Sequence, residues 1–525
     1  MSDKLQLASR LWQRDASLWS VHEPEKVAIL NRLGWLDAPG WICQQLGALK
    51  DWVADTLASG QFQQIVVLGM GGSSLAPEVL CNVVPSAPGF PSLSILDSTA
   101  PEMVRNVLEA DLKHTLFIVA SKSGTTLETA DLYRFFFHKV GQISASPGDQ
   151  FVAITDQDSW LQGHAEEMGF RHTFINPSDI GGRYSALSYF GMVPAALCGL
   201  DVTRLLDQAN AYTKTTQDNL PDQNDALALG IFLGQQALMG RDKMQLEIAD
   251  RFSALGIWIE QLVAESTGKL GKGILPVCAS EGAPSHGGDD VFYVRISDGE
   301  RGQSEHTTDR EINWSITDPL SIGAEFFKWE FATAIAAHYL GINPFDEPNV
   351  AEAKNSTNRF IKSGEILETS GSVDTPQFEL HQMAADESAM GQTASAFFAA
   401  LQPGNYISLL AYLPIEHPFI SALENLRQRL SERYGVACTV GFGPRYLHST
   451  GQLHKGGAST GCFVQFISES VGDYDVPESG YSFSQLLRAQ ADGDISVLAS
   501  KGLPVMRVRL KGDRLASIAG FADAI

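Results

Sequence analysis

From about residue 62 onward, short apolar runs alternate with helix-length stretches, and few folds are compatible with this alternation. The runs are IVVLGM from Ile65, LSILDS from Leu93, TLFIVAS from Thr115 and FVAITD from Phe151. Continuous apolar runs of this length are typical of strands buried on both faces, and the stretches between them are long enough for crossover helices. The pattern therefore predicts an α/β protein in which helices cover a parallel sheet.

The rest of the chain is divided by the same reasoning. Apolar runs at Tyr406–Leu413, Cys462–Ile467 and Val505–Leu510 predict strands near the C-terminus. The polar stretches Asp298–Asp318 and Ser363–Thr375 are expected to be loops, the second of them at a boundary. We therefore expect two doubly wound parallel-sheet domains plus a C-terminal α/β segment. The expected parts are a helical segment at residues 1–58, domains at residues 59–220 and 221–368, and the last segment at residues 369–525.

Composition and charge exclude several classes of protein. The formal net charge of -23 argues against nucleic-acid binding and against an anionic membrane surface, since both need clustered Lys and Arg. It does not argue against a small anionic substrate, which a few amides and cations can hold locally. The six cysteines contain no C-x-x-C pair, so we expect neither disulfides nor a metal site. With no secretory signal at the N-terminus, a cytoplasmic enzyme or binding protein is expected.

Two loops that follow predicted strands contain the residues expected to bind a ligand. Gly69–Ser74 reads GMGGSS, and Ser121–Thr126 reads SKSGTT. In a parallel sheet, ligands bind at the carboxyl ends of the strands. Glycines there let the backbone approach a ligand, while hydroxyls and the free N–H groups of the next helix donate to phosphate oxygens. Both loops therefore indicate a phosphate-binding site.

A dinucleotide site is the alternative for the first loop, because Gly69-x-Gly71 is half of a G-x-G-x-x-G motif. However, Ser74 stands where the third glycine is expected. Asp97, the candidate ribose-binding acid, follows Gly69 by 28 positions rather than by roughly 20. The spacing therefore disfavours a dinucleotide.

The second loop has four hydroxyl side chains in six residues and resembles the phosphate loop of the sugar isomerase (SIS) domain. The resemblance implies that both doubly wound domains are SIS-like. It also implies that the ligand is a sugar phosphate, with the Lys122 amide among its donors. The substrate-binding residues expected from the two loops and the later GGRY motif are Gly71, Ser73, Ser121, Lys122, Ser123, Thr126 and Gly182.

Three further motifs resemble signatures of the phosphoglucose isomerase family. They are GGRYSALS at Gly181–Ser188, ESTGK at Glu265–Lys269 and NPFDEPNVAEAK at Asn343–Lys354. The resemblance implies that glucose 6-phosphate and fructose 6-phosphate are exchanged through a cis-enediol, with no cofactor and no metal. It assigns the proton-carrying carboxylate to Glu265, the arginine beside the enediolate to Arg183, and a ring-opening lysine to Lys354.

The sequence also departs from the family pattern. The family commonly has Asn at the position of Thr267, Gln at that of Glu347 and often Trp at that of Pro348. A carboxylate at position 347 would be unfavourable beside a bound phosphate unless it faced away or were protonated. These departures put a phosphate contact from this position in doubt.

The ring-opening histidine of the family lies in a Gly-Gln-His run, which has no direct counterpart after the ESTGK motif. His286 is one candidate there, and the segment GPRYLHSTGQLHKGG at Gly443–Gly457 supplies His448 and His454. Because Thr450-Gly451-Gln452 precedes it, we assign ring opening to His454 and keep the other two histidines as alternatives.

The C-terminal sequence is similar to the end of fused transaldolase/phosphoglucose isomerase proteins. A transaldolase barrel needs roughly 250 residues before the isomerase part, so a stand-alone isomerase is expected. The alternatives are a dual phosphoglucose/phosphomannose isomerase and a non-catalytic SIS sensor of sugar phosphates. A sensor would need no base, so Glu265, Arg183 and Lys354 together disfavour it. The resemblance also favours a homodimer with its sites near the subunit interface.

Overall fold

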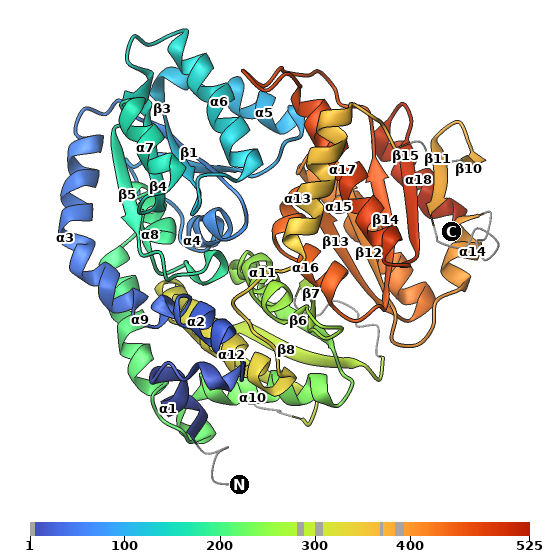
Figure 1. Ribbon diagram of the computed structural model, residues 1–525, viewed down its shortest axis with the longest axis horizontal. Coiled ribbons are helices and arrows are strands. Elements are labelled where there is room, and N and C mark those ends of the chain that lie inside the picture. The colour runs from blue at the N-terminus through green and yellow to red at the C-terminus, as the bar shows by residue number, and fades with distance from the viewer. Residues whose placement is uncertain (1–5, 281–287, 300–307, 368–370, 384–392) are drawn as a thin grey trace.

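Three sheets with parallel strands, each packed against helices, form the computed structural model (Figure 1). The structure describes residues 6–280, 288–299, 308–367, 371–383 and 393–525. The predicted α/β fold class is confirmed. Among the described residues, no helix combines the length and the apolar character that crossing a bilayer requires.

The first sheet follows the predicted apolar runs. Its strands are β1 (Gln64–Gly69), β2 (Ser92–Leu96), β3 (Thr115–Ala120), β4 (Phe151–Asp156) and β5 (His172–Asn176). All are parallel, in the order β2-β1-β3-β4-β5. The helices that connect them are α4 (Leu75–Val83), α5 (Pro101–Leu108), α6 (Leu127–Gly141) and α7 (Trp160–Glu167). Strands β1, β3 and β4 are almost entirely buried, as continuous apolar runs require.

Helices before and after this sheet cover it and lead to the next one. The N-terminal helices predicted from leucine and tryptophan spacing are present as α1 (Leu7–Trp12), α2 (Glu23–Leu30) and α3 (Ala38–Leu57). The later helices are α8 (Tyr189–Leu197), α9 (Val202–Thr215) and α10 (Asp225–Leu238). Three short 3-10 turns also matter below: η4 (Gly71–Ser73), η7 (Gly182–Tyr184) and η12 (Arg445–His448).

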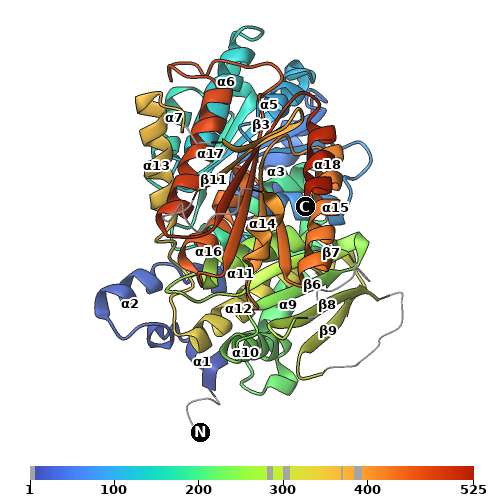
Figure 2. The same cartoon turned by 90° about the vertical axis from the view of Figure 1, so that its right-hand side faces the viewer.

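The second sheet has four parallel strands in the order β7-β6-β8-β9. They are β6 (Lys243–Ile248), β7 (Leu275–Ser280), β8 (Val291–Asp298) and β9 (Glu311–Ile316), with helices α11 (Leu255–Thr267), α12 (Ile322–Leu340) and α13 (Val350–Ser363). The expectation of a loop throughout Asp298–Asp318 was wrong, because β9 lies within it. Figure 2 shows β9 at the edge of its sheet. Five of its six residues are only partly buried, so its sequence, EINWSI, lacks the apolar run that marked the inner strands.

The C-terminal segment forms a third sheet, in the order β10-β11-β15-β14-β12-β13. Its strands are β10 (Gly371–Asp374), β11 (Phe378–Met383), β12 (Tyr406–Tyr412), β13 (Ala437–Phe442), β14 (Gly461–Ile467) and β15 (Val505–Leu510). Its helices are α14 (Ala394–Ala399), α15 (His417–Tyr434), α16 (Gly451–Gly456), α17 (Phe483–Ser500) and α18 (Arg514–Ala524). Strands β12 to β15 are parallel, and β10 and β11 pair antiparallel at one edge.

The same strand order recurs in all three sheets. If the parallel strands of each sheet are numbered along the chain, their spatial order begins 2-1-3-4 every time. In doubly wound sheets, ligands bind where this order reverses, between strands 1 and 3, at the carboxyl ends. In the first sheet this point lies between β1 and β3, which end at the two predicted phosphate loops.

The cores place the third sheet against both of the others. One continuous apolar cluster runs from the N-terminal helices through the first two sheets, from Leu7 to Phe345. In a second cluster, Phe483 of α17 packs with Phe117 of β3. In a third, Tyr406 of β12 packs with Leu275 of β7. Loops of the third sheet can therefore reach the space between the first and second sheets.

Candidate active site

The SKSGTT loop connects the carboxyl end of β3 to the first turn of α6, as the sequence predicted. Gly124 has a φ of +72°, and a Cβ there would lie 2.6 Å from the backbone nitrogen of Leu161, so this turn requires glycine. The Gly124 amide donates to Ser121 Oγ at 3.1 Å. The Lys122 side chain leaves the loop and pairs with Asp156 on β4. An anion in the loop would therefore meet the Lys122 amide rather than its ammonium group.

The GMGGSS loop forms η4 and lies directly against η7. A Cβ on Gly72 would lie 1.9 Å from the carbonyl oxygen of Gly182, so the two turns can pack only with glycine there. Gly71 has a φ of +55°, and a Cβ on it would lie 2.6 Å from Gln261 Nε2 and 3.0 Å from the carbonyl oxygen of His448. Segments from all three sheets therefore meet at this loop.

Asp97, the acid that a dinucleotide would need, is engaged within the protein. Its carboxylate accepts a hydrogen bond from Ser74 Oγ at 3.1 Å and pairs with Arg445 at 2.8 Å. Only 2% of the residue is exposed. Both partners would have to be displaced before Asp97 could bind a ribose. The contacts of Asp97 therefore disfavour a dinucleotide, as does its spacing from Gly69 in the sequence.

Glu265 and Arg183 form a buried ion pair between the first and second sheets. Glu265 lies in the last turn of α11, and its Oε1 is 3.4 Å from Arg183 Nη1. The exposed fractions are 7% for Glu265 and 4% for Arg183. Burial raises the pKa of Glu265 above its usual value of 4.5, although the nearby Arg183 opposes the rise. Gln261, one turn earlier, donates to the other carboxylate oxygen at 3.2 Å.

The Arg183 guanidinium is held on several sides. Its Nε donates to Ser266 Oγ at 2.9 Å, and its Nη2 donates to the carbonyl oxygen of Asp346 at 2.9 Å. Glu347, the residue that departs from the family pattern, pairs with Nη1 at 3.2 Å. The Glu347 carboxylate therefore faces a guanidinium, and this contact offsets its charge.

Lys354 and His448 line one cavity of about 160 Å³. Lys354 is on α13 and His448 ends η12, the turn that follows β13 of the third sheet. Thr125 of the phosphate loop lines the same cavity. The cavity therefore joins the phosphate loop to both a lysine and a histidine.

Glu128 holds His448 in this cavity. Its Oε1 lies 3.2 Å from His448 Nε2 and accepts a hydrogen bond from Gln490 Nε2 at 2.8 Å. Burial opposes the ionisation of Glu128, but His448 and Lys354 outweigh that effect, and the pKa of Glu128 is lowered. Gln490 is fixed in turn by Thr99, whose hydroxyl donates to its side-chain oxygen at 2.7 Å. A chain of hydrogen bonds thus orients the histidine.

His454 lies in different surroundings from His448. Only 4% of it is exposed, and its Nδ1 is 2.9 Å from the Tyr406 hydroxyl in the core of the third sheet. Its ring stacks on Tyr406 and meets the edge of Phe463. Burial, with a smaller contribution from Lys455, lowers the pKa of His454 to about 3. His286, the remaining candidate, lies outside the described residues.

Sequence reasoning did not assign a role to Glu128, Gln261 or Gln490. Glu128 was visible, because it follows Thr126, the last residue of the SKSGTT loop, by two positions. Gln261 precedes Glu265 by one helical turn, which places both on the same face of α11. Nothing near Gln490 in the sequence indicates its contact, because its partner Glu128 lies 362 positions away.

The chain matches a model of the phosphoglucose isomerase family over residues 42–275. A glucose-6-phosphate isomerase of Citrifermentans bemidjiense is 27% identical over 363 residues, which are 59% of this chain and 68% of the relative. One from Lactococcus lactis subsp. cremoris is 25% identical over 410 residues, which are 66% of this chain and 90% of the relative. The matched family segment contains the phosphate loop, Arg183 and Glu265, and it ends before Lys354 and His448.

The fold is also similar to a solved structure. The crystal structure of a glucose-6-phosphate isomerase from Chlamydia trachomatis aligns with a TM-score of 0.53 at 20% sequence identity. The alignment covers 68% of this chain and 78% of that one. This likeness concerns the fold, and the side chains that do the chemistry must be argued from their own geometry.

Proposed function

We infer that this chain, whose residues 42–275 match a model of the phosphoglucose isomerase family, interconverts glucose 6-phosphate and fructose 6-phosphate. The observation that carries the inference is the buried carboxylate of Glu265, 3.4 Å from the guanidinium of Arg183. A base beside a fixed positive charge suits proton abstraction next to a carbonyl, because the charge stabilises the enediolate as it forms.

In the proposed reaction, Glu265 removes the proton from C2 of the open-chain aldose, and electrons move through the new C1–C2 double bond to the carbonyl oxygen. The proton of the C2 hydroxyl passes to the C1 oxygen, and the same carboxyl group returns its proton to C1 as C2 becomes the carbonyl carbon, which gives the ketose. Arg183 remains charged throughout and helps most when negative charge is present on the enediolate oxygens. The raised pKa of Glu265 brings the carboxyl group closer to working pH, so it can both accept and release the proton.

The phosphate group is proposed to bind where the order of the first sheet reverses. Ser121, Ser123 and Thr126 would donate through their hydroxyls, and Lys122 through its amide. The loop precedes α6, whose positive N-terminal end favours an anion. The turns that contain Gly71, Ser73 and Gly182 are proposed to supply close backbone contacts to the sugar, since they pack against each other and Gly71 lies against Gln261.

Ring opening is proposed to use His448 with Lys354, which moves this role away from His454. His448 lines the cavity beside the phosphate loop, whereas His454 is enclosed by the core of the third sheet. An acid–base group must come within hydrogen-bonding reach of the ring oxygen or its hydroxyl. The lining of one cavity by both His448 and Lys354 supports this assignment.

The homodimer expected from the resemblance and the cytoplasmic location expected from the N-terminal sequence remain proposals. Within the described residues of one chain, Thr125 of the phosphate loop and His448 line one cavity, and Gln261 donates both to Glu265 and to the carbonyl oxygen of His448. We therefore propose that each chain completes its own site.

The function is tested by adding fructose 6-phosphate to the purified chain. A coupled dehydrogenase then measures the glucose 6-phosphate that forms. We expect turnover with a kcat of roughly 1–10³ s⁻¹, the range of typical enzymes. A second arm with mannose 6-phosphate tests the dual isomerase, because only a site that accepts both C2 epimers converts it to fructose 6-phosphate. Binding of glucose 6-phosphate with no turnover of either substrate would instead support the sensor.

Replacing Gln490 with Leu tests the hydrogen-bond chain to His448. The variant removes a donor to a buried carboxylate, so we expect kcat for glucose 6-phosphate to fall about tenfold with little change in KM. Because ionised Glu128 loses a stabilising hydrogen bond, its pKa rises, and the inflection of the kcat profile that Glu128 sets, below that of Glu265, moves to higher pH. Gln428→Leu, at an exposed position on α15, is the matched control. An unchanged pH profile in the Gln490 variant would contradict this role.

A further inference from the structure

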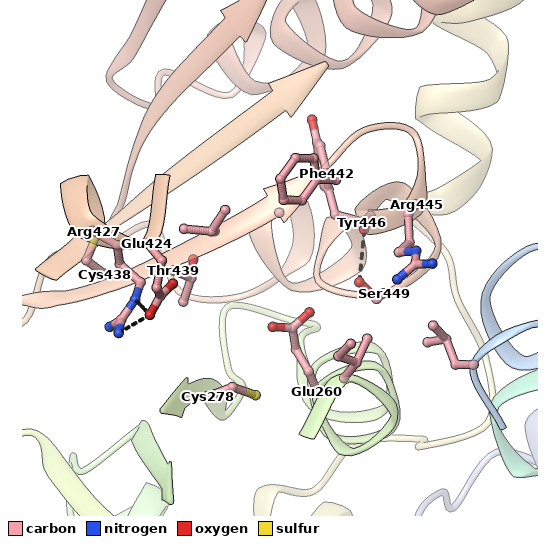
Figure 3. Close-up of a pocket in the computed structure, with 14 residues that line it drawn as sticks. Glu260, Cys278, Glu424, Arg427, Cys438, Thr439, Phe442, Arg445, Tyr446 and Ser449 are labelled. Carbon is pink, nitrogen blue, oxygen red and sulfur yellow. Dashed lines mark hydrogen bonds and ion pairs between the residues drawn. The ribbon is translucent and has the colours of Figure 1, made fainter. Parts of the chain in front are cut away.

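A second cavity, of about 180 Å³, lies behind the turn that carries His448. It is enclosed by α11, β7, α15, β13 and η12, where the second and third sheets meet (Figure 3). Arg445 and Ser449, on either side of His448 in the sequence, line this cavity, whereas His448 itself lines the other one. The turn therefore separates two cavities, and the mechanism proposed above uses only one of them.

Glu260 directs its carboxylate into this second cavity. Figure 3 shows the side chain rising from α11 toward Ser449, away from the strand that carries Cys278. Within the described residues, Glu260 has no ion-pair partner. A carboxylate in such a place is costly to ionise unless a positive charge joins it.

The two arginines that line the cavity already have acidic partners. Arg427 of α15 donates to Glu424 at 2.6 Å. Arg445 pairs with Asp97 at 2.8 Å and with Glu78 at 3.1 Å. Both guanidinium groups are therefore engaged by other carboxylates, and Arg445 only partly offsets a charge on Glu260. A bound anion would have to compete with these carboxylates.

The ionisation of Glu260 reflects this arrangement. Burial raises the pKa of Glu260 to about 8, and the smaller opposing effects come from Arg445 and a hydrogen bond with Ser449. The other charged or titratable groups that line the cavity are the Glu424–Arg427 pair of α15, the thiols of Cys278 and Cys438, and the Tyr446 phenol. Burial raises the pKa of both thiols and of the phenol, so all three stay neutral. A pKa raised in this way favours the protonated form of the Glu260 carboxyl group at neutral pH.

We propose that this cavity binds a small organic cation, a primary alkylammonium, whose charged end pairs with Glu260. The alkyl chain would lie against Ile257, Val440 and Phe442, which line the same space. A cavity of ~150 Å³ can hold benzene, so a ligand of about five heavy atoms fits. A metal ion is a poorer occupant, because the described residues contain no group of three or more His, Cys, Asp or Glu placed to hold one.

Butylammonium is the probe, and butan-1-ol, with the same number of heavy atoms, is its uncharged match. We expect butylammonium to raise the thermal unfolding midpoint in a saturable way, because it binds the folded state, and butan-1-ol to have no such effect. Equal stabilisation by the alcohol, or none by the amine, would overturn the proposal. Binding is measured on the free chain, so it can fail while isomerase activity stands, and the reverse also holds.

The pH dependence of binding separates this site from a nonspecific apolar pocket. An alkylammonium, like the Lys side chain, stays cationic below about pH 10. Its binding should release one proton from Glu260, which calorimetry in buffers of different ionisation enthalpy detects near pH 7. As pH rises toward the Glu260 pKa, the dissociation constant of butylammonium should fall about tenfold per pH unit. Above that pKa it should level off. A pH-independent constant without proton release would contradict the proposal.

Two variants locate the binding site. Glu260→Gln keeps the shape of the side chain but cannot be ionised, so we expect at least about tenfold weaker butylammonium binding and no proton release. Glu432→Gln, exposed on the nearby α15, should bind as the unaltered chain does. Cys278→Met, which adds volume to the cavity wall, should also weaken binding and serves if the Glu260 variant does not fold. Unchanged binding in both cavity variants would overturn the assignment.

Discussion

Replacing Glu265 with Gln is expected to lower kcat for glucose 6-phosphate by about 10³-fold, near the middle of the range that general acid–base groups contribute. Glutamine keeps the side-chain shape but cannot carry the proton between C2 and C1. It also leaves Arg183 without one of its two carboxylate partners, and the guanidinium remains paired with Glu347. Binding of glucose 6-phosphate, measured by calorimetry, should change far less than kcat.

Glu330→Gln is the matched control, because Glu330 is also a buried glutamate. Burial raises the pKa of Glu330 well above its usual value, so the residue is already uncharged and the neutral glutamine should leave turnover unchanged. If the Glu265 variant retained near-normal kcat, the proton carrier would have to be another group.

The pH profile of the unaltered chain offers a further check on Glu265. The base must be ionised to accept a proton, so kcat/KM should fall as pH decreases through its pKa in the free enzyme. Because burial raises that pKa, the acidic limb should lie above pH 4.5, the usual value of a glutamate. The limb should disappear from the small residual activity of Glu265→Gln. A limb that persists there would belong to a different residue.

The single replacements His448→Ala and His454→Ala are expected to differ in their effects: the first lowers turnover, and the second lowers the stability of the fold. Loss of His448 removes the group proposed to open the sugar ring, so turnover of cyclic glucose 6-phosphate should fall by about 10²-fold. Loss of His454 removes a buried ring and leaves the Tyr406 hydroxyl without a partner, which should destabilise the fold by about 2–4 kcal/mol. The His454 variant should therefore unfold at a lower temperature yet keep its kcat while folded.

Exchange spectroscopy of the two glucose 6-phosphate anomers measures ring opening separately from isomerisation. The His448 variant should slow anomer exchange as well as overall turnover, whereas the folded His454 variant should slow neither. If His454→Ala abolished exchange at a temperature where it is fully folded, the original assignment from the Gly-Gln-x-His spacing would be restored. Thermal unfolding of both variants provides the stability comparison.

The sequence was most informative where the determinants are local. The strands of the first sheet are continuous apolar runs, and the SKSGTT loop lies within a few residues of one strand end, so both could be predicted. Glu265 and Arg183 could be assigned through a family resemblance, but only the fold brings them together. Strand β9 could not be found because an edge strand needs no apolar run.

The histidine shows the limit of local patterns most clearly. His448 and His454 lie six positions apart in one glycine-rich segment, and composition cannot tell which of them faces a cavity. The answer depends on how η12 packs against η4 and α13 and how α16 packs against α11 and α17, contacts that come from distant parts of the chain. The third sheet raises the same difficulty, because several of its strands were predicted but its 2-1-3-4 order was not.

The late position of His448 in the chain has a consequence for biosynthesis. The first two sheets share one continuous core that ends near Phe345, so a growing chain can pack that core before the last sheet has been made. Such a chain would contain the phosphate loop, Arg183 and Glu265 but not the histidine. Activity would therefore be the last property that a newly synthesised molecule acquires. An activity assay would report only those molecules in which the C-terminal sheet has docked.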